Sequence, residues 1–220
     1  MFNALVWSFD VITNINWLEV VKSLAPVATA FIAFVALRNW KRQDKAKREA
    51  EFLDILVEAT HTYLAEMERP VTLAEIAKIG MQSHIPTWES GDEAGKAAKG
   101  AIAYIQKDGV EFAKKMQESL EGAQPSFVKL KSLVVKGQLF QFVGYENCLE
   151  AVASLTWQFE RIAALTATIG SPTLNWEHPL VLDRLKKVSS IDVEELRVEL
   201  QERNVDVIKF ASATYKKIYG

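Results

Sequence analysis

The residues best suited to metal chemistry in this sequence are Glu58 and His61, which stand three positions apart. Residues with this spacing share one face of a helix, and Glu-x-x-His pairs supply ligands to carboxylate-bridged di-iron sites in helical bundles. Such a site requires a second Glu-x-x-His on another helix, and the sequence contains none. We therefore expect His61 to be a surface or hydrogen-bonded residue, and we expect no metal or other cofactor.

Other catalytic patterns are absent from the sequence. Small helical ribonucleases of the HEPN class carry an Arg followed shortly by a His, and the nearest spacing here, Lys78 to His84, has the wrong cation. The segment 91–96 has the wrong spacing for a phosphate loop, and Ala97 stands where Ser or Thr is needed. Cys148 falls on an apolar helix face, which favours packing over nucleophilic chemistry. We expect no enzymatic activity.

Aromatic residues offer a second kind of candidate site. Trp176 and His178 lie in a loop bounded by prolines, where an exposed indole beside a histidine suits a protein partner. Trp88, Trp157 and Trp176 could instead line a ligand pocket, although tryptophan in a helical protein is more often part of the core.

The elements that would position these residues follow an apolar stretch near the N-terminus. Residues 23–37 carry no charge, and as a helix they would extend ~22 Å, less than the ~30 Å hydrocarbon core of a bilayer. Trp17 and Trp40 flank the stretch, where interfacial indoles are common, and the helix between them would reach about 36 Å. The sequence predicts a transmembrane helix; a buried core helix of a soluble protein is the alternative.

A basic collar follows the apolar stretch and favours the membrane interpretation. Six cations stand within eleven residues against one acid, Asp44, and the first sixteen residues contain no Lys or Arg. This asymmetry predicts an N-terminus outside and a C-terminal body in the cytoplasm, with the chain in the inner membrane. A solvated helix face or a nucleic-acid patch are the alternatives. The collar consists of Arg38, Lys41, Arg42, Lys45, Lys47 and Arg48.

One side of the predicted membrane helix carries small residues. Ala25, Thr29, Ala33 and Ala36 recur at spacings of four, four and three, which allows transmembrane helices to approach closely. This pattern predicts a homo-oligomer.

Composition limits the remaining function classes. The net charge of the 220 residues is −2 although the collar is strongly basic, so the rest of the chain is acidic, and nucleic acid is an unlikely partner. A single cysteine allows no internal disulfide, in agreement with a reducing compartment. Membrane lipid and a cytoplasmic protein are the partners that we expect.

Helical periodicity and capping signals predict an all-α protein. We expect an interfacial apolar segment at 1–16, a transmembrane helix at 17–40, and a cytoplasmic bundle at 41–220 whose first helix, 41–68, continues the anchor. Prolines and glycines divide the rest into further helices. Their expected ranges are 72–83, 90–122, 126–142, 146–169, 179–188 and 192–218.

An anchor, a basic collar and a cytoplasmic helical body together resemble the layout of small membrane accessory or effector proteins of bacterial phage-defence systems. The resemblance implies a non-catalytic protein whose cytoplasmic body binds a partner and whose copies then assemble in the membrane. The assembly could form a pore or function without one. The alternative is a soluble or peripheral helical domain, either a binding module or a HEPN-like enzyme without its motif, whose apolar N-terminus is buried in its own core or in a partner.

Overall fold

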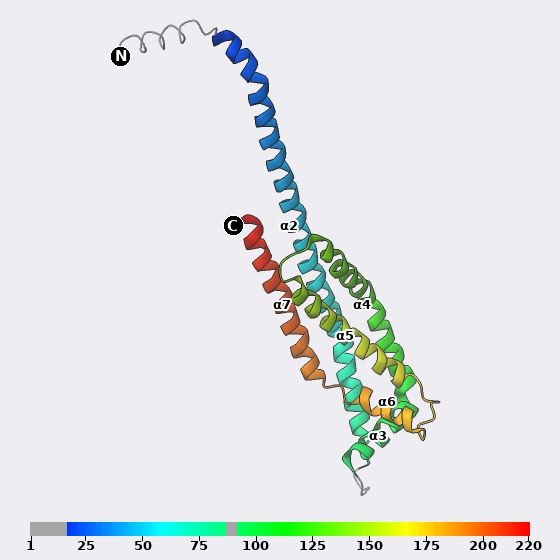
Figure 1. The fold of residues 1–220 in the computed structure, drawn as a ribbon. Helices are drawn as coiled ribbons and strands as arrows, with labels where there is room; N and C mark the ends of the chain where they lie inside the picture. The colour runs from blue at the N-terminus through cyan, green and yellow to red at the C-terminus, as the bar shows by residue number, and fades with distance from the viewer. Residues whose placement is uncertain (1–16, 87–91) are drawn as a thin grey trace, which may run out of the picture. The chain divides into compact units, whose positions relative to one another are not determined.

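The computed structural model describes residues 17–86 and 92–220, with side chains described from residue 21 (Figure 1). All regular structure in these ranges is helical, so the predicted all-α class is confirmed. The chain divides into two compact units, Met1–Arg48 and Glu49–Gly220. The elements are α2 (Trp17–Ser83), α3 (Glu93–Tyr104), the π turn η1 (Ile105–Gly109), α4 (Val110–Gly137), the 3₁₀ turn η2 (Gln138–Phe140), α5 (Tyr145–Ile169), α6 (Pro179–Ser189) and α7 (Val193–Tyr219).

Helix α2 does not end before Pro70, and this part of the prediction is wrong. Its buried face continues across the proline, from Tyr63 and Met67 to Val71 and Met81. An interior proline costs ~3 kcal/mol, whereas burying a Val or Met side chain contributes about 1.5–3 kcal/mol. The core contacts beyond residue 70 therefore offset the lost backbone hydrogen bond.

A second predicted break, between residues 122 and 126, is also absent. Pro125 lies inside α4, with Leu120 buried before it and Leu130 buried after it. Ser126, expected to begin a helix, instead donates its hydroxyl to the Ala123 carbonyl at 2.9 Å. Here too the continuous buried face outweighs the local helix-breaking signal.

The interruption occurs earlier, at the π turn η1, within the range where one helix from 90 to 122 is predicted. Gly109 ends this turn, and a Cβ built there would lie 2.5 Å from the Ile169 carbonyl oxygen. The glycine thus permits close contact between this turn and the end of α5, where a side chain would collide with the carbonyl. The predicted cap, Ser90, lies outside the described residues; Asp92 accepts a hydrogen bond from the Gly95 N–H at 3.0 Å.

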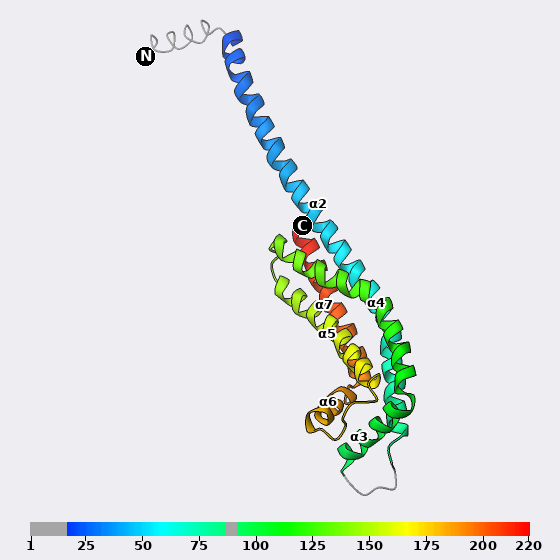
Figure 2. The same ribbon diagram turned by 90° about the vertical axis from the view of Figure 1, so that its right-hand side faces the viewer.

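Helices α5 and α7 begin and end close to the residues that the sequence predicts. The three-four spacing predicted for 146–169 is the buried face of α5, which includes Cys148, Leu155 and Ile169. Asp192 caps α7 as expected, because its Oδ1 accepts from the N–H groups of Glu194 (2.9 Å) and Glu195 (3.2 Å). Within the unit Glu49–Gly220, α4, α5 and α7 lie alongside α2 in both views (Figures 1 and 2).

A long-range hydrogen bond joins α2 to the rest of this unit. Tyr63 is fully buried, and its hydroxyl donates to the Leu155 carbonyl on α5 at 2.8 Å. Burial raises the pKa of this phenol well above its ordinary value, so Tyr63 remains a neutral donor.

The turn between α4 and α5 is held by aromatic side chains. Phe140 and Phe142 stack on Phe52 of α2, with ring centroids 4.8 and 5.8 Å away. Tyr145 donates its hydroxyl to the Val134 carbonyl at 2.7 Å. Gly137 fits beneath that ring, because a Cβ there would lie 1.9 Å from the Tyr145 oxygen. These contacts pack the turn against α2 and α4.

Candidate functional site

The first candidate site is the apolar segment, residues 21–37, which is exposed along its whole length. Its 18-residue window has a mean hydropathy of 1.5, none of it is buried, and the helix is long and apolar enough to cross a membrane. Leu24, Phe31 and Phe34 are each about 60% exposed or more. In water such a surface would be costly on every side of the helix, whereas lipid tails would cover it without desolvation.

The predicted packing face lies within this segment. Ala25, Thr29, Ala33 and Ala36 are all exposed, and the Thr29 hydroxyl donates to the Ala25 carbonyl at 2.8 Å. Because this bond satisfies the hydroxyl within its own helix, Thr29 can face lipid or another helix without an unpaired donor. The indole of Trp40 is exposed, and the Trp17 side chain lies outside the described residues.

The basic collar is exposed as well. All six cations have solvent-facing side chains, and Arg48 pairs with Asp44 at 2.7 Å one helical turn away. Exposed ion pairs of this kind contribute at most ~1 kcal/mol. The collar is therefore a solvated set of cations that can reach anionic headgroups.

Glu58 and His61 lie on α2 beyond the collar, and both are exposed. No group of three or more potential metal ligands occurs among residues 17–86 and 92–220. His61 lines a groove between α2 and α7.

This α2/α7 groove has a volume of about 700 Å³. Leu64, Val71 and Leu200 form its apolar part, and polar residues of both helices border it. Asn204 also lines it, and the Asn204 Oδ1 is buried with no hydrogen-bond partner. A buried acceptor left unpaired is costly, and this cost falls on the α7 wall of the groove.

At the edge of the groove, Arg197 is held by two carboxylates. Its guanidinium donates to Glu75 of α2 at 2.5 Å and to Glu194 of α7 at 3.2 Å. The hydrogen bonds to Glu75 and Glu194 raise the pKa of Arg197 above its ordinary value. The pair with Glu75 links α7 to α2 beside the groove.

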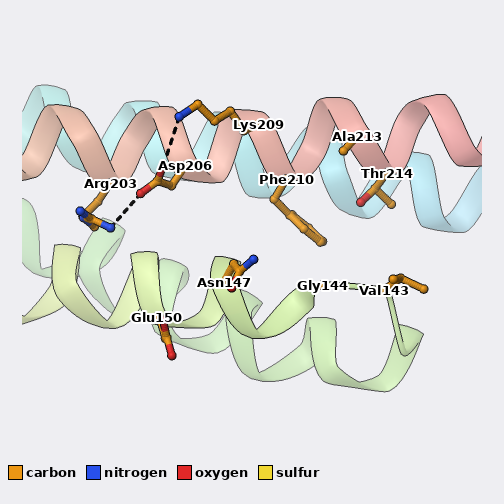
Figure 3. A pocket seen from close by; sticks show the side chains of 10 residues that line it. All are labelled: Val143, Gly144, Asn147, Glu150, Arg203, Asp206, Lys209, Phe210, Ala213 and Thr214. Carbon is orange, nitrogen blue, oxygen red and sulfur yellow. Dashed lines mark hydrogen bonds and ion pairs between the residues drawn. The ribbon is translucent and has the colours of Figure 1, made fainter.

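A second groove, between α5 and α7, has a volume of about 460 Å³ (Figure 3). Phe210 extends from α7 toward α5 near Asn147 and Gly144. Asp206 lies between Arg203 and Lys209, at 2.8 and 3.6 Å from their nitrogens. Two cations and one carboxylate are thus paired beside the aromatic ring of Phe210.

Polar side chains hold α5 against α7. Gln158 is fully buried, and its amide donates to the Glu199 carboxylate at 2.5 Å. Ser154 donates to the other Glu199 oxygen at 2.6 Å, and Arg161 donates to Gln158 at 3.0 Å. Because every member has a partner, this cluster fixes the register of α7 and with it the walls of both grooves.

The predicted partner loop differs from expectation. Trp176 is half-buried, packs against the core, and donates its indole N–H to the Pro172 carbonyl at 3.4 Å. His178 is exposed but serves as the cap of α6, with Nδ1 accepting from the Leu180 N–H at 3.3 Å. The expected exposed indole is therefore wrong for Trp176. Trp157, expected in a core or pocket, is 57% exposed on α5, and Trp88 lies outside the described residues.

Cys148 is fully buried in α5. Burial raises the pKa of its thiol to about 12, so almost no thiolate forms near neutral pH. This agrees with the expected packing role.

Sequence reasoning misses both grooves. They combine residues of α7 with segments about 50 to 140 positions away, and no local motif marks such pairs. The unpaired Asn204 acceptor likewise has no sequence signal.

No family model, curated protein or solved structure matches this chain, so the proposals below depend on its own residues.

Proposed function

We propose that this chain is a single-pass membrane protein whose helical body binds a cytoplasmic protein and whose anchor assembles with copies of itself. The observation that carries the proposal is the apolar segment, residues 21–37, exposed on all sides and followed at once by six cations. A helix that is apolar all round requires either lipid or a protein surface around it.

The collar supports a definite orientation. Lys/Arg bias near the ends of a span sets its direction, and Lys22 is the only cation before Arg38. The N-terminus then lies outside and Glu49–Gly220 lies in the cytoplasm. Each cation near an anionic surface contributes ~1 kcal/mol to lipid attraction.

The role of the body is recognition rather than catalysis. The α2/α7 groove and the α5/α7 groove present apolar floors with polar edges, which suit a protein partner. Occupation of a groove would bias the arrangement of the bundle helices, and α2 carries both a groove wall and the apolar segment. Binding in the cytoplasm would thereby be coupled to assembly in the membrane, where several copies can form a pore.

Self-association is tested with Ala33→Leu. The added volume separates backbones that approach through the small-residue face, so we expect a smaller oligomer by light scattering in detergent, with membrane insertion unchanged. Val27→Phe is the control, because it also adds bulk at an exposed position of the same segment but lies opposite the small-residue face, at about 100° of rotation per residue. An oligomer unchanged by Ala33→Leu, or weakened equally by both variants, removes this face from the interface.

A further inference from the structure

The turn between α4 and α5 presents large apolar side chains to solvent. Leu139 and Val143 are 81% and 77% exposed, and Val135, one helical turn earlier, is 64% exposed. Connecting turns are usually polar, so this concentration at one end of the bundle requires an explanation.

These side chains do not belong to a loosely held loop. The residues between them, Phe140 and Phe142, face inward onto Phe52, and Phe142 also contacts Phe210 of α7 at 5.9 Å between centroids. Gln141 adopts a left-handed conformation, φ 54°, which a non-glycine residue rarely takes. The inward aromatic residues thus hold Leu139 and Val143 in outward positions.

The turn lies at the end of the bundle where the chain enters from the apolar segment. Phe52 lies twelve positions after Trp40, a distance of ~18 Å as helix and at most ~43 Å fully extended. The connecting chain is therefore short enough for this turn to reach the bilayer surface when the body inclines toward it.

Cations border the same end of the unit. Lys136 lies in the last turn of α4, and Lys216 and Lys217 lie in the last turn of α7. That turn of α7 is beside the start of the bundle, because Tyr215 donates its hydroxyl to the Ala50 carbonyl at 3.0 Å. Exposed aliphatic side chains bordered by lysines are typical of surfaces that enter the headgroup region of anionic membranes.

We propose that Val135, Leu139 and Val143 form a second membrane contact, in which the α4–α5 turn inserts into the headgroup region beside the anchor. The inference rests on the proposed membrane anchor, because a patch this small needs a tether. Tethering converts the contact into an intramolecular event at high effective concentration, so a few apolar side chains suffice. The contact would hold the body against the bilayer and set the direction in which its grooves face.

The test uses the full chain in vesicles of phosphatidylcholine and phosphatidylglycerol, with a nitroxide attached to one introduced cysteine at a time. The buried Cys148, whose thiol pKa is about 12, remains unlabelled under mild conditions. Val143→Cys reports the turn, and Trp40→Cys reports the anchor. Leu180→Cys is the matched control, because Leu180 is 74% exposed on α6, away from the turn (Figure 1).

For each nitroxide label we measure the ratio of its collision rate with oxygen to its collision rate with a water-soluble nickel chelate. We expect this ratio to be several-fold higher at positions 143 and 40 than at position 180. A lipid-like ratio at 40 with a water-like ratio at 143 overturns the second contact and leaves the anchor in place. Water-like ratios at both positions contradict the anchor itself. If the label at 143 is shielded from both reagents and couples to a label on another copy, the patch is an interface between copies and the inference is wrong.

Discussion

Placing an arginine at the centre of the apolar segment should reduce stable insertion of the chain to about half. Ala30 lies midway between Ser23 and Leu37 and is exposed. Eight large apolar side chains surround it in the segment, and at about −0.3 to −0.6 kcal/mol each they favour insertion by about 2–5 kcal/mol. They are Val21, Leu24, Val27, Phe31, Ile32, Phe34, Val35 and Leu37.

Ala30→Arg adds about 2.5–3.5 kcal/mol at the helix centre, which brings the balance close to zero. The inserted fraction should fall from nearly all of the chain to about half, since 1.4 kcal/mol corresponds to ~10-fold in the equilibrium. The assay is flotation of the full chain with membranes in high salt, which removes chains held by the collar alone. Gln43→Arg is the matched control, because it adds the same side chain at an exposed position within the basic collar, and it should float like the unmodified chain.

The exposed position of Ala30 separates the two interpretations of this segment. An arginine on a helix in water would be tolerated and would raise solubility. If Ala30→Arg floats as completely as Gln43→Arg, the segment does not cross the hydrocarbon core and the reasoning from hydropathy is wrong.

Three further predictions concern packing, acid stability and orientation. Gly109→Ala forces a methyl group against the Ile169 carbonyl and should destabilise the fold by ~1–3 kcal/mol in denaturant unfolding. The control Gly122→Ala adds a methyl group where nothing lies within 4 Å and should stabilise the fold by ~0.5–1 kcal/mol. Equal effects of the two variants on the free energy of unfolding would contradict the close contact at Gly109. Hydrogen bonds from the Glu195 and Glu194 N–H groups lower the pKa of Asp192 below its usual 3.8. The stability that this carboxylate contributes is complete above its pKa in the unfolded chain and is lost as pH falls through its pKa in the folded protein. Asp192→Asn should therefore flatten the fall of stability with acid, and an unchanged slope would show that this cap does not cause the fall. Changing all six collar cations to Gln should scramble the orientation of a C-terminal cytoplasmic reporter and weaken binding to anionic vesicles, and a variant with neither effect would make the collar an ordinary solvated face.

Local signals in the sequence predict the helices that are regular from end to end. The three-four spacing of Cys148, Val152, Leu155 and Phe159 places the buried face of α5 correctly, and the cap at Asp192 marks the start of α7. The buried positions of α2 from Phe52 to Met67 are likewise predicted. In each case the periodicity and the tertiary packing favour the same structure.

Prediction fails where packing overrides a local signal. Pro70 and Pro125 are normally helix-breaking, yet buried residues on both sides keep α2 and α4 intact. Gly109, which ends the π turn, lies against the Ile169 carbonyl, sixty residues away, and this contact cannot be predicted from its neighbours in the sequence. For the same reason the grooves along α7 appear only once the helices are assembled.

The central claim is that the apolar segment crosses a membrane, and alkaline carbonate extraction of membranes carrying the unmodified full-length chain tests it most directly. Carbonate strips proteins held by charge or by protein contacts, whereas a spanning helix remains because its apolar surface is enclosed by lipid. We predict that the protein stays in the membrane pellet and is released only by detergent. Recovery of the chain in the carbonate supernatant without detergent would contradict the account.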